Sequence, residues 1–427
     1  MPCEEDFLER GALVRLQEEK LRRLLEEVLG RNRFYTEKFA GAGIERGTIG
    51  SIADLARLPF TTKGEILADQ ASHPPYGSNL TYPVAQYCRL HQTSGTRGSP
   101  LRWLDTAQSW DALVHCWERM YRIAGIGAGE RLFFAFSFGP FLGFWTGFEA
   151  ASRIGCLCLA GGGLSSGARL RMLLDNRATV LLCTPTYALH LAEVARNQGI
   201  DLASAGVKTV IVAGEPGGSI PATRACIEAA WNARVLDHSG MTEVGPMAIE
   251  CPPNPAGLHI LESEYLVEVI DPASGRPAPP GTLGELVVTN LHRLGSPLLR
   301  YRTGDLVKVD PRPCPCGRTL VRLEGGILGR TDDMVHLRGN NFYPAALENV
   351  LRRFAEVVEY RVTIDEASAL AELKVEVEAA PGVDEKTLAE KVALAIRDEL
   401  LFRADVTLAP PGTLPRFEMK AQRIQRK

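Results

Sequence analysis

Short apolar runs alternate with helical patterns along the middle of this 427-residue chain. The runs at 179–183 and 209–213 are rich in valine, leucine and isoleucine, and helical patterns cover 187–198 and 222–231. Short strands that are apolar throughout are buried on both faces, and helices between them are typical of parallel pairing. The sequence therefore predicts an α/β fold in which a mostly parallel sheet is covered by helices.

Two further patterns lie before and after this region. Leucines at near-helical spacing among charged residues predict an amphipathic helix over 13–28. Three β-rich segments at 265–271, 284–290 and 306–310 are divided by turns rich in proline and glycine. We expect the helix to pack on the main body and the three segments to form a smaller antiparallel section.

The pattern changes again after Asp332. Helices are predicted at 343–354 and 385–401, with strands at 357–364 and 370–378 between them. A chain of this length is too long for one hydrophobic core of ordinary size. We therefore predict a large domain over 1–331 and a small α+β domain over 332–427.

The composition excludes several classes of protein. Charged residues make up 23% of the chain and hydrophobic ones 45%, and the net charge is −3. These values are typical of a globular protein and provide no broad basic surface for nucleic acid. The amino terminus is acidic where an export signal is basic, and the apolar segment 131–149 is interrupted by glycine and proline. With ten cysteines that we expect to be reduced, the chain is predicted to be cytoplasmic, without a membrane partner.

A loop rich in glycine and hydroxyl groups spans 92–100, with the sequence QTSGTRGSP. Glycines let a backbone approach an anion closely, and hydroxyl groups add neutral donors, so such a loop can hold phosphate. No Gly-Lys-Ser/Thr follows, so it is not a Walker A loop. A solvated turn is the alternative for the loop taken alone.

Three more segments follow the loop in order: SGMTE at 239–243, YRTGD at 301–305 and GRTDD at 329–333. Together the four resemble the AMP-forming adenylating superfamily of acyl-CoA synthetases, and most closely its phenylacetate-CoA ligase family. The resemblance extends over nearly the whole chain and includes 33–35, 58–63, 213–217, 414–416 and 420–421.

The resemblance implies an ATP site. The residues that it assigns to the phosphates are Thr93, Ser94, Gly95, Thr96 and Gly98. Thr242 would bond the α-phosphate and Glu243 would hold Mg²⁺, which prefers carboxylate and phosphate oxygens. A solvated surface charge is the alternative for Glu243 taken alone. Ser99 stands where many relatives carry lysine.

The resemblance also implies contacts to the nucleoside. Asp305 would accept hydrogen bonds from the ribose hydroxyls, although an aspartate after glycine is also common in turns. Ser239 stands where the family usually has an aromatic residue against adenine, and His238 could replace it or be structural. The remaining nucleotide-binding residues on this basis are Gly214, Glu215, Pro216, Asp237 and Arg330.

Three residues near the carboxyl end match positions with other roles. Lys420 corresponds to the lysine that approaches the carboxylate and the α-phosphate, where an ammonium offsets negative charge. Asp332 corresponds to the pivot of the small domain, and Gly339 would give the pantetheine arm room to pass. An ordinary tight turn is the alternative for the segment around Gly339.

An apolar acyl pocket and a metal site complete the candidates. The aromatic residues Phe138, Phe141, Phe144 and Trp145 could line a pocket for an aromatic acid, or could simply be core. Cys251, His259, Cys314 and Cys316 offer three sulfurs and one imidazole, a set suited to tetrahedral structural Zn²⁺. This set has no open position, so we expect it to join two loops. The alternative is that the Cys-Pro-Cys-Gly segment is only a turn.

The resemblance thus predicts an ATP-dependent ligase that activates an aromatic or arylacetic acid, with phenylacetate as the leading substrate, and transfers it to coenzyme A. One alternative is adenylyl transfer without coenzyme A, as in relatives that resemble coenzyme F390 synthetase. Another is a weakened protein that holds an acyl-adenylate and loads it onto a carrier. A homodimer is compatible with the resemblance.

Overall fold

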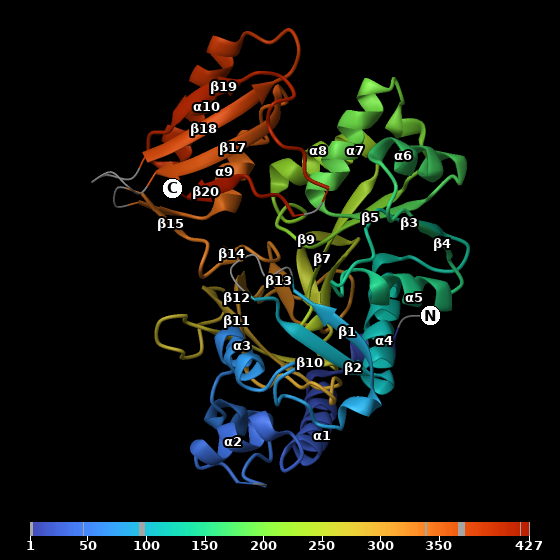
Figure 1. The fold of residues 1–427 in the computed structure, drawn as a ribbon, viewed down its shortest axis with the longest axis vertical. Helices are drawn as coiled ribbons and strands as arrows, with labels where there is room; N and C mark the ends of the chain where they lie inside the picture. The colour runs from blue at the N-terminus through green and yellow to red at the C-terminus, as the bar shows by residue number, and fades with distance from the viewer. Residues whose placement is uncertain are drawn as a thin grey trace. The chain divides into compact units, whose positions relative to one another are not determined.

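The computed structural model describes residues 3–45, 47–93, 99–337, 340–365, 372–418 and 420–426 (Figure 1). The chain divides into two compact units. The first is made of Met1–Gly163 and Leu236–Gly326, and the second of Leu164–Val235 and Ile327–Lys427. Each unit therefore combines segments that are far apart in the sequence. The predicted division into domains 1–331 and 332–427 stays a prediction.

The helices of the first unit are concentrated in its amino-terminal part. Its α-helices are α1 (Arg10–Val28), α2 (Arg33–Gly41), α3 (Lys63–Ser72), α4 (Ala107–Ala124) and α5 (Trp145–Arg153), and its short 3-10 helices are η1 (Glu4–Phe7), η2 (Ile52–Arg57) and η3 (Val84–Gln86). Helix α1 confirms the amphipathic pattern predicted over 13–28. Its apolar face, including Leu21, Leu24 and Val28, is buried in a cluster with Tyr35 and Leu299.

The strands of the first unit form both parallel and antiparallel pairs. They are β1 (Tyr87–Gln92), β2 (Arg102–Thr106), β3 (Arg131–Phe134), β4 (Leu157–Ala160), β7 (Arg234–Met241), β8 (Gly245–Cys251), β9 (Asn254–Ile260), β10 (Tyr265–Ile270), β11 (Leu283–Asn290), β12 (Tyr301–Lys308) and β13 (Arg322–Glu324). Strands β3 and β4 are parallel. The antiparallel sets are β1 with β2, β7-β8-β9-β13 and β10-β11-β12.

The second unit begins with alternating helices and strands. These are α6 (Ser166–Asp175), β5 (Val180–Cys183), α7 (Pro185–Asn197), η4 (Leu202–Ser204), β6 (Thr209–Val212) and α8 (Pro221–Trp231). Strands β5 and β6 are parallel and buried along their whole length. Helix α7 starts cleanly because the Thr184 hydroxyl accepts from the Tyr187 amide and Pro185 occupies the first turn.

The carboxyl-terminal part of the second unit is a helix-and-sheet layer. Its elements are β14 (Gly329–Arg330), β15 (Val335–Leu337), β16 (Asn340–Phe342), α9 (Pro344–Leu351), β17 (Val357–Asp365), β18 (Glu372–Ala379), α10 (Glu385–Leu400), β19 (Asp405–Ala409) and β20 (Ile424–Arg426). A four-stranded sheet has the order β19-β18-β17-β20, drawn in orange to red in Figure 1. Val362, Val375 and Val377 of this sheet are fully buried in one cluster with Leu351 and Val392 of the helices.

The α/β fold predicted from the sequence is confirmed, with parallel strand pairs, helices and an antiparallel section. The structure differs in detail where pairing is non-local. Strand β12 begins at Tyr301, five residues before the predicted segment at 306, and the antiparallel strands β7, β8 and β9 were not predicted. Among the residues that the structure describes, no helix is both long and apolar enough to cross a membrane.

Candidate functional site

Thr93 closes the base of the glycine-rich loop. Its amide donates to the Leu101 carbonyl at 3.0 Å, and its hydroxyl accepts from the Leu101 amide at 3.0 Å. Both residues extend the β1–β2 hairpin, so the hairpin fixes where the loop leaves the sheet. The other residues predicted to hold phosphate, Ser94, Gly95, Thr96 and Gly98, lie outside the described residues.

Glu243 is a buried carboxylate with two defined neighbours. It is 4% exposed, and its Oε1 accepts the Tyr301 hydroxyl at 2.8 Å and lies 3.6 Å from Lys63 Nζ. Lys63 is the first residue of α3, whose start is fixed by reciprocal hydrogen bonds between Thr62 and Glu65. Among the described residues both contacts of this carboxylate engage Oε1, which leaves Oε2 for a cation.

The backbone around Glu243 is held by a fully buried arginine. Arg293 Nη1 donates to the Thr242 carbonyl at 2.8 Å and to the Glu243 carbonyl at 3.0 Å. Its Nε and Nη2 each donate to one oxygen of Asp105 at 2.6 Å, and neither side chain is exposed. Asp105 lies on β2, so this ion pair connects the hairpin below the glycine-rich loop to the Thr242–Glu243 turn.

Gly245 completes that turn. Its φ of +95° is in the left-handed region, and a Cβ there would lie 2.4 Å from Leu113 Cδ2. A side chain at this position would therefore meet both backbone strain and a steric clash. The turn that presents Thr242 and Glu243 depends on a glycine here.

Asp305 lies in an irregular part of β12. Residues 303–305 lie opposite Leu286 alone, because the register shifts there and Gly304 has a φ of +76°. The Thr303 hydroxyl donates to the Leu286 carbonyl at 2.7 Å and accepts from the Asp305 amide at 3.0 Å. Bulges of this kind redirect side chains beside functional sites. The buried Asp305 is therefore held by a bulge, whereas the sequence alone also allowed a simple turn.

The structure places His238 within an aromatic cluster. Its ring centroid lies 4.4 Å from that of Trp117, and its Nδ1 donates to the Ala248 carbonyl at 2.9 Å. Burial lowers the pKa of His238 to about 4, so the imidazole is neutral at pH 7. Asp237, which precedes it on β7, is buried and accepts from the His238 amide at 3.0 Å, and Ser239 pairs with Ala248.

The predicted acyl-pocket residues lie in and beside the same cluster. Phe144 is buried, with its ring 4.3 Å from Phe136 and 5.4 Å from Trp117. Phe138 is half-buried and lies edge-on to Trp145 at 4.8 Å. Trp145 is exposed, and its Nε1 donates to the Gly139 carbonyl at 3.1 Å. Phe141 is also half-buried. Of the four predicted pocket residues, Phe144 is therefore core, and the other three keep exposed ring surface.

In the second unit, Lys420 lies beside the loop between β6 and α8. A Cβ added at Gly214 would be 3.8 Å from Lys420 Cε, so the lysine side chain passes close to this glycine. Glu215 accepts from the Thr186 amide at 2.9 Å and from the Ala421 amide at 2.7 Å. Burial raises the pKa of Glu215 despite these two donors. The next residue, Pro216, is exposed.

Arg330 and Asp332 are close to each other in the second unit. Arg330 Nε donates to Asp332 Oδ1 at 3.0 Å, and both side chains are partly exposed. Asp332 lies in the turn between β14 and β15. Gly339 lies outside the described residues.

The four predicted zinc ligands are brought together in the first unit. The ligand atoms of Cys251, His259, Cys314 and Cys316 all lie within 4.8 Å of one another. Cys251 Sγ is 3.6 Å from Cys314 Sγ, and Cys316 Sγ is 3.5 Å from His259 Nε2. Zinc–sulfur bonds of about 2.3 Å at tetrahedral angles place two sulfurs about 3.8 Å apart, so the spacing fits zinc. Burial lowers the pKa of His259 to about 4, which keeps a ring nitrogen free to bind a cation.

The chain is similar to known proteins along nearly its whole length. A family model described as AMP-binding enzyme matches residues 86–292, and one described as AMP-binding enzyme C-terminal domain matches residues 339–427. A phenylacetate-coenzyme A ligase of Thermus thermophilus is 34% identical over 434 residues, which cover 97% of this chain and 96% of that protein. The chain belongs to the phenylacetate-CoA ligase family.

Solved structures agree with this membership. 2-Hydroxyisobutyryl-CoA ligase in its postadenylation state, in complex with R3-HIB-AMP, superposes with a TM-score of 0.95 at 29% identity, covering 99% of this chain and 91% of that one. The same ligase in its thioesterification state, with 2-HIB-AMP and CoA, superposes with a TM-score of 0.76 at 30% identity over the same shares.

Sequence reasoning missed several residues that this phenylacetate-CoA ligase family member places around Glu243. Asp105 and Arg293 give no local signal, since charged residues are expected to be exposed. Lys63 follows a recognisable helix-start pattern, Thr62 with Glu65 three residues on, which predicts the helix but not the contact. The folded structure brings Lys63 to the Glu243 carboxylate and Arg293 to the Glu243 carbonyl.

Proposed function

We propose that the chain is an AMP-forming acid-CoA ligase whose substrate is an aromatic or arylacetic acid. The observation that carries the proposal is the buried Glu243, fixed by Tyr301 and Arg293 beside Thr242, in a chain 34% identical to a phenylacetate-coenzyme A ligase over nearly its full length. Burying a carboxylate costs free energy even when a hydroxyl group donates to it. A carboxylate buried and oriented in this way is therefore a candidate for a functional role.

In the first half-reaction, a carboxylate oxygen of the acid attacks the α-phosphorus of ATP. The bond from that phosphorus to pyrophosphate breaks, so the products are acyl-adenylate and pyrophosphate. In this proposal Thr242 donates to an α-phosphate oxygen, Asp305 accepts from the ribose hydroxyls, and the Lys420 ammonium offsets the charge on the pentacovalent phosphorus. Arg330 contacts the sugar or a phosphate.

Glu243 fits a role as a Mg²⁺ ligand. Its Oε2 is available, it is buried, and its Oε1 is held by Tyr301 Oη at 2.8 Å, so the carboxylate is oriented. Bound there, Mg²⁺ would neutralise phosphate charge. Lys63, 3.6 Å from Oε1, supplies a second positive charge near these phosphates.

In the second half-reaction, the thiolate of coenzyme A attacks the acyl carbonyl carbon. The bond from that carbon to the AMP oxygen breaks, and AMP leaves. We propose Asp332 as the pivot that precedes this step and Gly339 as the passage for the pantetheine arm, since both match the family positions.

An aromatic acid is the substrate class that the surroundings support. Phe138 and Phe141 are half-buried, and the ring of Phe138 lies 6.4 Å from that of the buried Phe134, which in turn lies 6.3 Å from that of the buried Phe144. Aromatic rings pack well edge-on or offset against such walls. The Thermus thermophilus relative is a phenylacetate-coenzyme A ligase, which points to the same class.

We further propose that Cys251, His259, Cys314 and Cys316 bind one structural Zn²⁺. Four protein ligands leave no open position, so the metal would join the β8–β9 hairpin to the loop after β12 without taking part in chemistry. Thiolates that bind zinc must be reduced, which favours a cytoplasmic location.

The test is a pyrophosphate-release screen over aryl, arylacetic and fatty acids, with and without coenzyme A. We expect release with arylacetic acids, formation of thioester and free AMP when coenzyme A is added, and loss of release by orders of magnitude in Lys420→Ala. AMP retained in the product would instead indicate adenylyl transfer. Adenylate formed but never passed to coenzyme A would indicate carrier loading. No release with any acid would overturn the proposal.

A further inference from the structure

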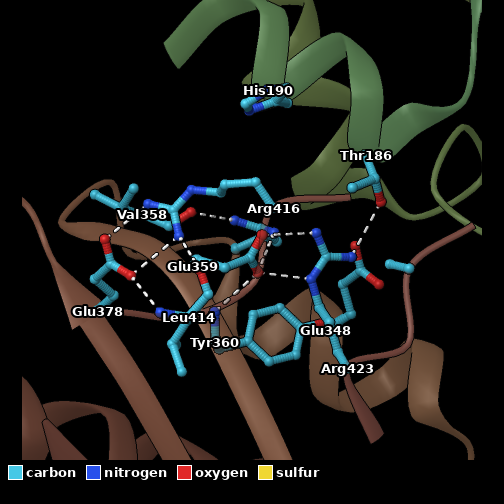
Figure 2. A network of polar contacts seen from close by, with 12 residues as sticks. Thr186, His190, Glu348, Val358, Glu359, Tyr360, Glu378, Leu414, Arg416 and Arg423 are labelled. Carbon is cyan, nitrogen blue, oxygen red and sulfur yellow. Dashed lines mark hydrogen bonds and ion pairs between the residues drawn. The ribbon is translucent and has the colours of Figure 1, made fainter. Parts of the chain in front are cut away.

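Residues 416–423, which include Lys420, are attached to helix α7 through an arginine at each end. Arg416 precedes the lysine and Arg423 follows it, and both reach from the carboxyl-terminal layer of the second unit to helix α7 (Figure 2). All of these residues belong to the second compact unit. The arrangement suggests that the position of Lys420 is set by contacts outside its own loop, which lies between β19 and β20.

Arg416 bridges two carboxylates. Its Nη2 donates to Glu193 of α7 at 2.8 Å and to Glu378 of β18 at 2.7 Å, and Nε also donates to Glu193 at 2.8 Å. The side chains of Arg416 and Glu193 are only 21% and 24% exposed. His190, whose Nδ1 lies 3.5 Å from Glu193 Oε2, and Arg416 lower the pKa of Glu193 to about 2, so Glu193 stays charged at pH 7.

Arg423 makes a corresponding bridge on the other side. It donates from Nε to Glu359 of β17 at 2.6 Å and from Nη1 to the Thr186 hydroxyl at 3.1 Å. Its guanidinium also lies 5.2 Å from the ring centroid of Tyr360. Figure 2 shows Arg423 between Thr186 on helix α7 and the Glu359–Tyr360 strand.

Two more contacts lie between the arginines. Glu418 is 3.3 Å from Nη1 of Arg169, a buried residue of α6. The Ala421 amide donates to Glu215, which also caps the first turn of α7 through the Thr186 amide. Lys420 thus lies within a stretch of eight residues that contacts α6, α7 and the Gly214–Glu215 loop at four points.

We propose that Glu193, Thr186, Arg416 and Arg423 are positioning residues that hold Lys420 in place for adenylate formation and release it for thioester formation. The inference rests on the proposed function, because it assigns to Lys420 a role in the first half-reaction alone. Each bridge joins the carboxyl-terminal layer to residues 164–235, so each must break if that layer turns about Asp332.

One observation links these contacts to the first half-reaction. The contacts are formed in a structure that superposes with a TM-score of 0.95 on 2-hydroxyisobutyryl-CoA ligase in its postadenylation state, against 0.76 for its thioesterification state.

The two bridges to helix α7 differ in strength. Arg416 to Glu193 is a charged pair, whereas Arg423 meets a neutral hydroxyl on α7, which makes Glu193 the stronger determinant.

The variants Glu193→Gln and Thr186→Val test the inference because they remove only the α7 side of each bridge. Arg416 keeps Glu378 and Arg423 keeps Glu359, so the carboxyl-terminal layer stays intact. We expect adenylate formation to slow about threefold to tenfold in Glu193→Gln and less in Thr186→Val. Attack of coenzyme A on supplied acyl-adenylate should stay within about twofold of the wild-type rate. Glu399→Gln, which removes an ion pair with Arg353 at the surface of the same layer, is the matched control and should change neither rate.

Trypsin provides a readout that does not depend on activity. Cleavage after Arg416, Lys420 or Arg423 should be about threefold to tenfold faster in Glu193→Gln than in the wild type or Glu399→Gln. The reason is that residues 416–423 separate from helix α7 more often in this variant. Equal losses in both half-reactions, or cleavage at the wild-type rate, would overturn the inference. A wild-type protein that adenylates no acid would overturn the proposed function instead, and the trypsin comparison would then decide this inference alone.

Discussion

Arg293 and Asp105 form an ion pair with no exposed surface, in which two guanidinium nitrogens each lie 2.6 Å from a different carboxylate oxygen. The remaining nitrogen of Arg293 donates to the carbonyls of Thr242 and Glu243. A pair of charges buried in this way stabilises little by itself, because both lose their hydration. The ion pair contributes geometry, because it fixes the backbone of Thr242 and of Glu243, the predicted Mg²⁺ ligand.

Replacing Arg293 should therefore damage both the fold and the site. We expect Arg293→Leu to lower the free energy of unfolding by about 3 to 5 kcal/mol, because Asp105 is left as an unpaired buried charge. Arg293→Lys keeps the charge but not the four hydrogen bonds, so it should lose less stability and still lose most adenylation. Denaturant titration and pyrophosphate release measure the two effects. Normal adenylation in Arg293→Lys would show that the hydrogen bonds of Arg293 do not position Glu243.

Tyr301 provides a second test of the role of the Glu243 carboxylate. Tyr301→Phe removes only the hydroxyl that donates to Glu243 Oε1 at 2.8 Å. A hydrogen bond to a charged group contributes about 1.5 to 3 kcal/mol, so we expect adenylation to fall about tenfold or more and the Mg²⁺ concentration for half-maximal rate to rise. Tyr82→Phe, which removes a hydroxyl that donates to Glu27 at 3.4 Å, serves as the control and should change neither quantity. An unchanged Mg²⁺ dependence in Tyr301→Phe would argue against Glu243 as the ligand.

The sequence predicts the elements whose signal is local. Helices α7 and α8 and strands β5 and β6 were predicted to within two residues at each end, because apolar periodicity and Gly/Pro breakers act over short distances. Strands β7 to β9 were not predicted, since their residues include many Gly, Pro and polar groups and their pairing depends on packing elsewhere.

From the sequence, only those residues of the candidate site that belong to motifs could be named. Glu243 and Asp305 were named from their motifs and the cysteine and histidine cluster from its chemistry, and their roles stay predictions. The residues that orient them were not found, because their partners are remote. Arg293 is 188 positions from Asp105, and Arg416 is 223 positions from Glu193. No pattern within a short window specifies such pairs.

Glu193 also predicts a dependence of stability on pH. Its folded pKa of about 2 lies below the ordinary glutamate value of about 4.5, owing to His190 and Arg416. A lowered folded pKa stabilises the protein above the unfolded value, and this contribution is lost as the pH falls from about 4.5 towards 2. We expect Glu193→Gln to be about 1 to 2 kcal/mol less stable than the wild type at pH 7, and most of this difference should be lost by pH 2.5. A difference that does not vary with pH would contradict the assigned pair.

The Cys251, His259, Cys314 and Cys316 cluster leads to the last prediction, which concerns metal. If the cluster binds zinc, purified protein should contain about one zinc per chain, and Cys316→Ser should lower metal content and melting temperature together, because metal binding is coupled to folding. Cys88→Ser changes an exposed cysteine outside the cluster and should alter neither quantity. Elemental analysis and thermal unfolding, each with and without a chelator, measure both. Metal-free protein that melts at the same temperature as the untreated sample would show that the four side chains meet for packing alone.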